Sequence, residues 1–257
     1  MAELDALGGP GSAFVKADLS LMAASDAVVR EYLAASGGRL DLLVLSPGIA
    51  TFQGFTPTPE GVDVKMALHY YSRAAAALAV SGCFVCFAVL LTAAAEAAPA
   101  LEAAGGACLF VLSGNFHSAH VPEDGRSWGL TAETYSLRAA ADAAGFYTDA
   151  AMATLARGHP RVRWVHANPG FVASSWGTEL PAPVRLLARF GQLFATSPAA
   201  CAERLASALL APPRGAFASD SSGNEVPPAA GMTEERRAAI WAHTTATLQA
   251  AGVKSAL

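Results

Sequence analysis

Apolar residues gather in short runs that alternate along the chain with longer stretches of helical spacing. The clearest run is Leu-Leu-Val-Leu at residues 42–45, which lies between Asp41 and the turn-forming sequence Ser46-Pro47-Gly48. Since the four aliphatic residues do not alternate with polar ones, both faces of this predicted strand should be covered, as in a parallel sheet between layers of helices. Ligands of such sheets bind beyond the carboxyl ends of the strands, where Gly48 is expected.

Further strands and helices follow from the same pattern. Strands are predicted at residues 13–16, 108–112 and 162–166, helices at 22–36, 60–73, 135–157, 181–194, 198–210 and 233–251, and a polar loop at 219–228. Asp18 or Ser20 is expected to cap the first helix. The order predicts one α/β domain over residues 1–257, with the sheet and its helices at 13–180 and a C-terminal helical segment at 181–257.

One stretch departs from this pattern. Residues 74–95 carry no charge and lie between Arg73 and Glu96. Their length meets the criterion for a membrane-spanning helix, although the many alanines contribute little to insertion. Two alternatives stay open: a helix that is buried in the domain or extends from it, and a membrane span, which would give membrane contact through residues 74–95. Cys83 and Cys86 within the run are predicted to be core residues, because no neighbouring cation would stabilise a thiolate.

Composition narrows the class of partner. The net charge is −4 and the 17 Lys and Arg are scattered, which argues against a nucleic-acid partner and favours a small uncharged metabolite. The four cysteines lie in apolar or helical surroundings in a chain too long to need a disulfide framework. The first residues lack the apolar segment of a signal peptide, so an intracellular, cytoplasmic protein is expected, with membrane association through the uncharged run as the alternative.

Five segments together carry a resemblance to a known family. These are Asp18-Leu19, EGVDVKMALHYY at residues 60–71, HANPGFV at 166–172, SPAACAERLASALL at 197–210 and IWAHTTATL at 240–248. The chain resembles the short-chain dehydrogenase/reductase superfamily, and more closely its retinol-dehydrogenase-like branch. The resemblance implies a Rossmann-like doubly wound parallel sheet, NAD or NADP as cofactor, a small carbonyl or alcohol substrate, and a homo-oligomer. Residues 181–257 would lie on the substrate side.

The resemblance also implies which residues hold the cofactor. Asp18 would contact adenine, Gly48 would belong to the turn after the family's fourth strand, and the loop with Pro169, Gly170 and Val172 would hold the nicotinamide. The family's first strand-helix-strand unit, with its glycine-rich pyrophosphate turn, has no counterpart in this sequence. Residues 8–11, Gly-Gly-Pro-Gly, cannot replace it, because no strand precedes them and the proline lacks an amide donor. A sheet that lacks this first unit is therefore expected.

The family's four catalytic positions are altered. They require an acid/base Tyr, a cation that lowers its pKa, a Ser for the substrate oxygen and an Asn for a relay water. The nearest candidates are Tyr135 with Arg138 three residues later, Ser113, and His69 at the Asn position. On a helix Tyr135 and Arg138 would share a face. Tyr147 is the other Tyr candidate and lacks a neighbouring cation.

Three alternatives remain open for the function. The leading hypothesis is an NAD(P)-dependent oxidoreductase. The second is a non-catalytic binding or interaction module with the same half-sheet, which the altered catalytic positions favour. The third is an incomplete gene product.

The interval from His69 to Ser113 is longer than the resemblance implies, so residues 80–92 are expected to be an insertion or a translated intron. No metal is expected, because His117 and His120 lack a third ligand nearby in the sequence.

Overall fold

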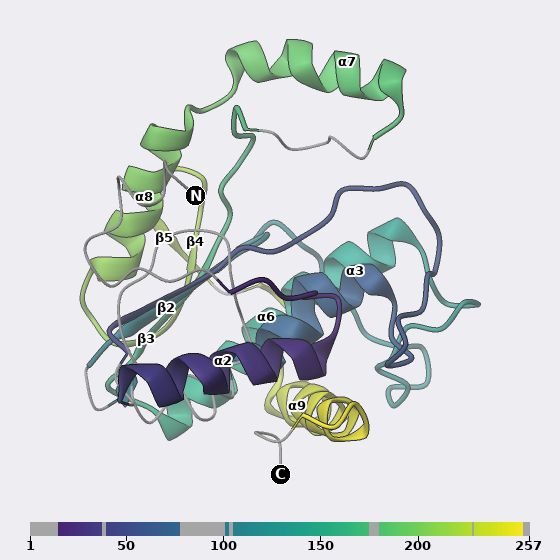
Figure 1. The fold of residues 1–257 in the computed structure, drawn as a ribbon, viewed down its shortest axis with the longest axis vertical. Helices are drawn as coiled ribbons and strands as arrows, with labels where there is room; N and C mark the ends of the chain where they lie inside the picture. Colours follow the sequence, from purple (N-terminus) through teal and green to yellow (C-terminus); the bar gives the residue numbers. More distant parts are fainter. Residues whose placement is uncertain are drawn as a thin grey trace.

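The computed structural model describes residues 15–37, 40–77, 101–102, 105–174, 180–227 and 229–253. Figure 1 shows a central sheet with helices on both sides and one helix, α7, that lies away from it. In chain order the named elements are α2 (Met22–Ser36), β1 (Leu42–Leu45), α3 (Val64–Met66), η1 (Ala67–Tyr71), α4 (Ser72–Ala76), β2 (Ala107–Val111), α6 (Leu137–Gly158), β3 (Arg163–Ala167), α7 (Ala182–Gly191), η2 (Gln192–Phe194), α8 (Pro198–Leu210), β4 (Gly215–Ser219), β5 (Glu225–Val226) and α9 (Glu234–Ala250).

Within the described ranges, the sheet has five strands in the order β1-β2-β3-β4-β5. Strands β1 to β4 are parallel, and β5 pairs antiparallel with β4. The predicted α/β class is confirmed, and β1, β2 and β3 lie within one residue of the predicted strands. The loop predicted at 219–228 contains β5, and β4 precedes it, so the segment after residue 180 is not wholly helical. Val15 and Lys16 are not in a strand, and the rest of that prediction lies outside the described residues.

The two faces of the sheet pack against different helices. Buried Cys108, Phe110 and Trp164 belong to a core that includes Met152 and Leu155 of α6. Alternate strand residues form a second core with α8: Ala107, Leu109, Val165 and Ala167 pack with Ala208 and Leu209. This arrangement is the doubly wound packing that the apolar runs predicted. The prediction is wrong for one strand face, because Val44 on β1 is 42% exposed.

Local caps explain where the helices begin. The side chains of Ser136, Ser197 and Thr233 accept backbone N–H groups at the starts of α6, α8 and α9. The cap of helix α2 differs from the predicted Asp18 or Ser20. The amides of Met22 and Ala23 donate instead to the carboxylate of Glu60, at 2.6 and 2.9 Å. A residue 37 positions away can cap a helix only when the tertiary fold brings it there.

The structure describes only the first residues of the uncharged run. Residues 74–77 are buried, the first three of them within α4, and the remaining residues 78–95, including the proposed insertion at 80–92, lie outside the described residues. Among the described helices, none combines the length and the apolar character that crossing a membrane requires.

Candidate functional site

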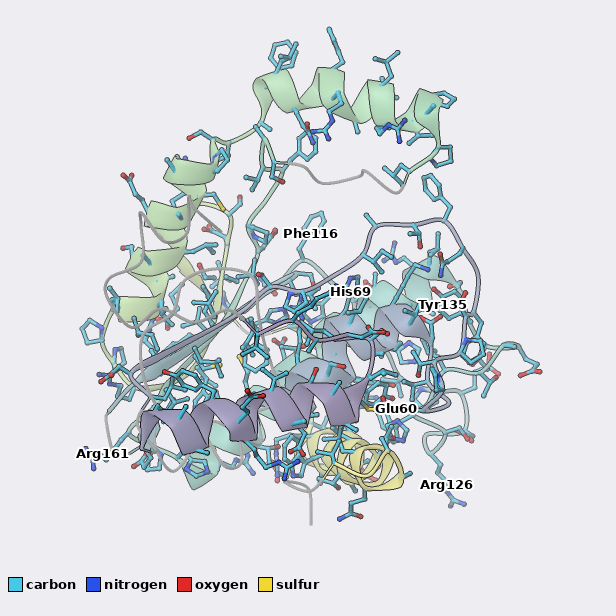
Figure 2. All side chains as sticks on the ribbon, viewed as in Figure 1. Glu60, His69, Phe116, Arg126, Tyr135 and Arg161 are labelled. Atoms are coloured by element: carbon cyan, nitrogen blue, oxygen red, sulfur yellow. The ribbon has the colours of Figure 1, made fainter. Side chains whose placement is uncertain are left out.

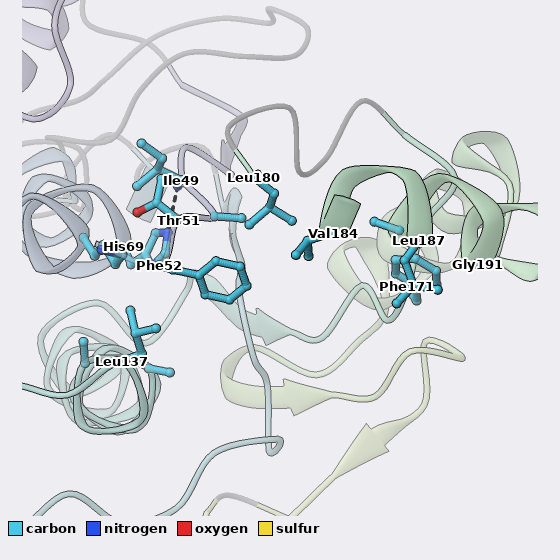
Figure 3. A pocket seen from close by; sticks show the side chains of 15 residues that line it. Ile49, Thr51, Phe52, His69, Leu137, Phe171, Leu180, Val184, Leu187 and Gly191 are labelled. Carbon is cyan, nitrogen blue, oxygen red and sulfur yellow. Dashed lines mark hydrogen bonds between the residues drawn. The ribbon is translucent and has the colours of Figure 1, made fainter. Parts of the chain in front are cut away.

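A mainly apolar pocket of about 470 Å³ lies beyond the carboxyl ends of β1 and β3. Figure 3 shows how three parts of the chain surround it: the segment after β1, the helices that carry His69 and Leu137 at the left, and α7 at the right. Its wall residues are Ile49, Ala50, Thr51, Phe52, Lys65, His69, Leu137, Ala140, Ala141, Phe171, Leu180, Val184, Leu187, Ala188 and Gly191. The position is the one at which parallel α/β sheets bind ligands.

Three polar side chains interrupt this apolar lining. The Thr51 hydroxyl oxygen is buried and has no hydrogen-bond partner among the described residues. The ammonium of Lys65 donates to the carbonyl of Gln53 at 2.9 Å, and burial lowers the pKa of Lys65. His69 is the third. Because polar groups in an apolar pocket orient a ligand through its own polar atoms, this set suits a ligand with one oxygen function on an apolar body.

The backbone holds His69 in one tautomer. The amide of Ile49 donates to Nε2 of His69 at 3.0 Å, so the ring proton is on Nδ1. Burial, together with the charges of Arg73 and Lys65, lowers the pKa of His69 to about 3, and the ring is neutral at physiological pH. Gly48 lies directly against this ring: a Cβ there would be 2.8 Å from Nε2. The structure therefore brings together two of the residues that the sequence singled out.

Buried Arg73 organises the loops at this end of the sheet. Its guanidinium donates to the carbonyls of Leu68, Val111 and Pro47. Val111 is the last residue of β2, and Pro47 follows β1. Burial lowers the pKa of Arg73 to about 9, so the group stays charged at neutral pH. Its hydrogen bonds tie the turn that carries Gly48 to the end of the neighbouring strand.

Tyr135 lies outside the pocket lining and beside Lys65. It precedes α6, and the Lys65 ammonium is 5.8 Å from the centroid of its ring. The hydroxyl is buried and has no hydrogen-bond partner among the described residues. Burial and the Asp63 carboxylate raise the pKa of Tyr135 to about 12, whereas the sequence predicted a lowered pKa. Figure 2 shows Tyr135 at the side of the molecule that carries α3, apart from Phe116.

The predicted pairing of Tyr135 with Arg138 is wrong. Arg138 is 77% exposed and donates to Asp142 at 2.8 Å and to the Ser118 hydroxyl at 3.1 Å. The shared-face argument fails because Tyr135 lies before the first residue of α6, where helical spacing does not apply. The alternative candidate, Tyr147, is a core residue whose hydroxyl donates to the Trp128 carbonyl at 2.6 Å.

The loop after β3 carries the predicted nicotinamide residues. The amide of Gly170 donates to the Asn168 side chain at 2.9 Å, and Gly170 has a φ of +68°, which favours glycine. Val172 forms a parallel bridge with Thr196, and Cys201 lies 3.8 Å from the Pro169 carbonyl. Asp18 is exposed and accepts from the amide and hydroxyl of Ser20, at 3.0 and 2.7 Å. Their roles toward a cofactor stay predictions.

Ser113 belongs to a second polar cluster, between the end of β2 and α6. Its amide donates to Nε2 of His166 at 3.2 Å, which places the His166 proton on Nδ1, 2.7 Å from the Asp149 carboxylate. Nε2 of His117 lies 3.2 Å from the other oxygen of Asp149, and Nδ1 of His117 is 3.5 Å from the Ser113 hydroxyl. The Cβ that a larger residue would add at Gly145 would lie 2.6 Å from that hydroxyl oxygen, so only glycine leaves room there.

Charge decides the protonation of this cluster. Burial lowers the pKa of His166 despite the nearby carboxylate of Asp149. Burial alone would also lower the pKa of His117, but the hydrogen bond and charge of Asp149 outweigh it and raise that pKa. The pKa of Asp149 lies well below its usual range: burial opposes this, and the two imidazoles outweigh it. Asp149 is therefore an anion that accepts from a neutral His166 and favours the protonated form of His117.

The ligand atoms of His117, Asp149 and His166 lie within 4.8 Å of one another, close enough to be considered as a metal site. Coordination through Nδ1 of His166 would require its proton to move to Nε2. The Ser113 amide already donates to Nε2, and a backbone amide cannot become an acceptor. The cluster is therefore better described as a hydrogen-bonded network than as a metal centre.

Lys65, Asp149 and His166 were not singled out from the sequence. A signal existed for Asp149, since it is a lone carboxylate in an apolar, alanine-rich stretch of a predicted helix. His166 stands in the middle of an apolar strand and was assigned only to a motif. Lys65 carried no local signal, because its burial depends on the segment after β1 folding over it.

Comparison with known proteins adds the fold relationship. No protein-family model matches the chain. Over 186 residues it is 29% identical to Oxidoreductase AN1596 of Emericella nidulans, covering 72% of this chain and 50% of that protein, so the chain spans half the length of this curated relative.

Solved structures give the same relationship at the level of the backbone. A short-chain dehydrogenase from Streptomyces avermitilis has a TM-score of 0.52 at 16% identity, covering 94% of this chain and 78% of the other. The NADPH-bound carbonyl reductase from chicken fatty liver has a TM-score of 0.50 at 18% identity, covering 88% and 81%. With its parallel sheet, its flanking helices and these neighbours, the chain has the Rossmann-like fold of the short-chain dehydrogenases/reductases.

Proposed function

We propose that the chain is the catalytic part of an NAD(P)-dependent oxidoreductase that acts on a carbonyl or alcohol group of an apolar substrate. The observation that carries the proposal is the apolar pocket beyond the strand ends, with Thr51, Lys65 and His69 as its polar groups. The curated relative is named an oxidoreductase, which supports the same class. The pocket's apolar lining supports a substrate whose body is hydrocarbon.

The pocket residues have separate roles in this proposal. The Thr51 hydroxyl, which lacks a protein partner among the described residues, donates a hydrogen bond to a carbonyl oxygen of the substrate or accepts one from its alcohol hydroxyl. Lys65 is the proton donor, because a lowered pKa makes its ammonium a stronger acid than that of an exposed lysine. His69 is neutral and positions the backbone at Ile49 and Gly48. Tyr135, the donor predicted from the sequence, is then the neighbour of Lys65.

A nicotinamide cofactor would supply or accept the hydride when bound. The loop with Pro169, Gly170 and Val172 supports the nicotinamide end, and Asp18 the adenine end. The pyrophosphate has no matching group among the described residues: the N-terminal amides of α2 already donate to Glu60. We therefore expect this chain to bind NADPH weakly, with a dissociation constant above the low micromolar range, which calorimetric titration measures. Tight binding would contradict this expectation.

The proposed activity is tested with an excess of NADPH and a series of ketones and aldehydes of increasing apolar size, while loss of reduced nicotinamide is followed by absorbance. We expect turnover that rises with apolar size. Lys65→Met should lower kcat about 100-fold, the typical worth of a general acid. The control is Arg126→Met, which replaces an exposed cation far from the pocket (Figure 2).

Tyr135→Phe separates the two assignments of the proton donor. If Lys65 is the donor, Tyr135→Phe should change kcat only a few-fold, because the hydroxyl is buried outside the pocket lining. If Tyr135→Phe abolishes turnover while Lys65→Met does not, the donor is Tyr135, as the sequence predicted.

The alternative function, a non-catalytic binding module, is favoured by one observation. Neither Tyr135 nor Arg138 lines the pocket, so the pair expected to perform acid/base work is not at the ligand. Under this alternative an apolar ketone binds to the chain, as calorimetry would detect, and no NADPH is consumed with any member of the series.

A further inference from the structure

Helix α7 and the turn η2 that follows it present a large apolar surface. None of their residues is buried. The exposed fractions are 74% for Leu186, 71% for Leu187, 61% for Phe190, 74% for Leu193 and 82% for Phe194. The rings of Phe190 and Phe194 contact each other edge to face, with centroids 6.0 Å apart. Scattered exposed apolar residues are normal on a protein surface, but a contiguous group of this size marks an interaction surface.

The charge carried by α7 and η2 is one-sided. Residues 180–202 contain Arg185 and Arg189 and no acidic residue or lysine, although the whole chain has a net charge of −4. Arg189 donates to the Ser174 carbonyl and to Gln192, so its guanidinium stays close to the helix. Figure 1 shows α7 at the edge of the molecule, lying apart from the sheet. An apolar, basic surface therefore sits where a flat partner can reach it.

We propose that α7 and η2 dock on the surface of an anionic lipid bilayer. Helices that lie in a membrane interface combine large apolar side chains with basic residues and need not be long enough to span the bilayer. Leu186, Phe190 and Leu193 would enter the boundary between headgroups and acyl chains. Arg185 and Arg189 would meet the lipid phosphates, and each basic residue near such a surface changes the partition about fivefold.

A second copy of the chain is a poorer occupant of the same surface. In a two-fold symmetric contact the same patch faces itself. Arg185 and Arg189 of one copy would then approach those of the other, and the patch has no acidic residue to offset them. A lipid surface supplies the missing negative charge.

Docking has a consequence for the pocket. Val184, Leu187, Ala188 and Gly191 of α7 also line the pocket, as Figure 3 shows for Val184, Leu187 and Gly191. A docked α7 would place the pocket beside the membrane, so an apolar substrate could enter from the lipid. This consequence rests on the proposed function, whereas docking itself does not.

The test is flotation of the chain with vesicles of phosphatidylcholine alone and with vesicles that contain one quarter phosphatidylserine. We expect binding to the mixed vesicles that weakens as salt is added. Leu186→Glu with Phe190→Glu should lower the partition more than about tenfold, and Arg185→Gln about fivefold. The matched control is Leu210→Glu, which changes an exposed leucine at the end of α8, 64% exposed, and should leave binding unchanged.

Circular dichroism of every variant shows whether the fold is kept, so loss of binding can be separated from unfolding. Three results would overturn the proposal. The first is equal binding to both kinds of vesicle, and the second is unchanged binding by the double glutamate variant. The third is no binding to vesicles, together with a dimer that sedimentation detects in the original chain and not in the double variant. The last result would assign the surface to a second copy. None of these measurements uses enzyme activity, so failure here leaves the proposed oxidoreductase function to its own test.

Discussion

Helix α6 lies against the sheet, whereas α7 lies apart from it, although both were predicted from the same kind of helical apolar spacing (Figure 1). The side chains differ in size. The buried face of α6 is built largely of alanine, with Phe146, Tyr147, Met152 and Leu155 as its larger residues, while α7 exposes leucine and phenylalanine. Small side chains let a helix approach strands closely, so the packed helix needs few large residues and the unpacked one shows many. The comparison teaches that an apolar face predicts a partner but not which partner.

The largest difference in stability between two variants should come from truncating one phenylalanine on each helix. Phe146→Ala on α6 should lower the free energy of unfolding by about 3 to 5 kcal/mol, because it leaves a cavity in the core. Phe190→Ala on α7 should change it by less than about 0.5 kcal/mol, because the side chain is already exposed. Urea denaturation followed by circular dichroism measures both. Equal losses would show that α7 packs against the domain in solution.

A second pair of variants compares cations. Arg73→Met removes a buried guanidinium and leaves the carbonyls of Val111 and Pro47 without that donor, which should cost about 3 kcal/mol of unfolding free energy. Arg189→Met on α7 should cost less than about 0.5 kcal/mol, as is usual for an exposed residue. If Arg73→Met were neutral, the guanidinium would not be what ties the ends of β1 and β2 together.

The third prediction concerns pH. The pKa of His117 is raised in the folded chain above its ordinary 6.5, so its pairing with Asp149 contributes fully below about pH 6.5 and is lost as pH rises through the folded value. Stability should therefore decline on the alkaline side of pH 6.5, and His117→Gln should remove that part of the decline. Thermal unfolding at a series of pH values measures it. An unchanged profile in the variant would mean that another group titrates.

The smallest effect is expected for the exposed side of α6 itself. Arg138→Met breaks a surface ion pair with Asp142 and should lower the unfolding free energy by no more than about 0.5 kcal/mol. It should leave turnover unchanged, because the guanidinium donates to Asp142 and Ser118 and does not line the pocket. A large loss of activity would revive the pair that the sequence suggested.

Much of the secondary structure could be predicted because it depends on neighbouring residues. Helices α2 and α8 and strand β1 have the predicted bounds, since apolar spacing and turn residues act within a few positions. Strand β4 (Gly215–Ser219) was missed because four of its five residues are glycine, alanine or serine, and β5 (Glu225–Val226) was missed because it has only two residues. Pairing with β3 decides the conformation of β4 instead, and pairing with β4 decides that of β5.

The candidate site was harder to predict from the sequence than the secondary structure was. The family resemblance led to His69. Position after a predicted strand led to Gly48 and Ser113, because every parallel strand directs its following residues to the same edge of the sheet. Helical spacing also paired Tyr135 with Arg138, which it permits only if both residues belong to the helix.

What the sequence by itself determined is the alternating order of strands and helices, the ends of the strands, and the helical character of α6 and α7, because those depend on interactions a few residues apart. Only the tertiary structure decided that Lys65 lies in the pocket, that Asp149 lies between two histidines, and that no residue of α7 is buried. Each of these depends on segments that are distant in the chain. Burial and charge then act on whichever groups the packing brings together.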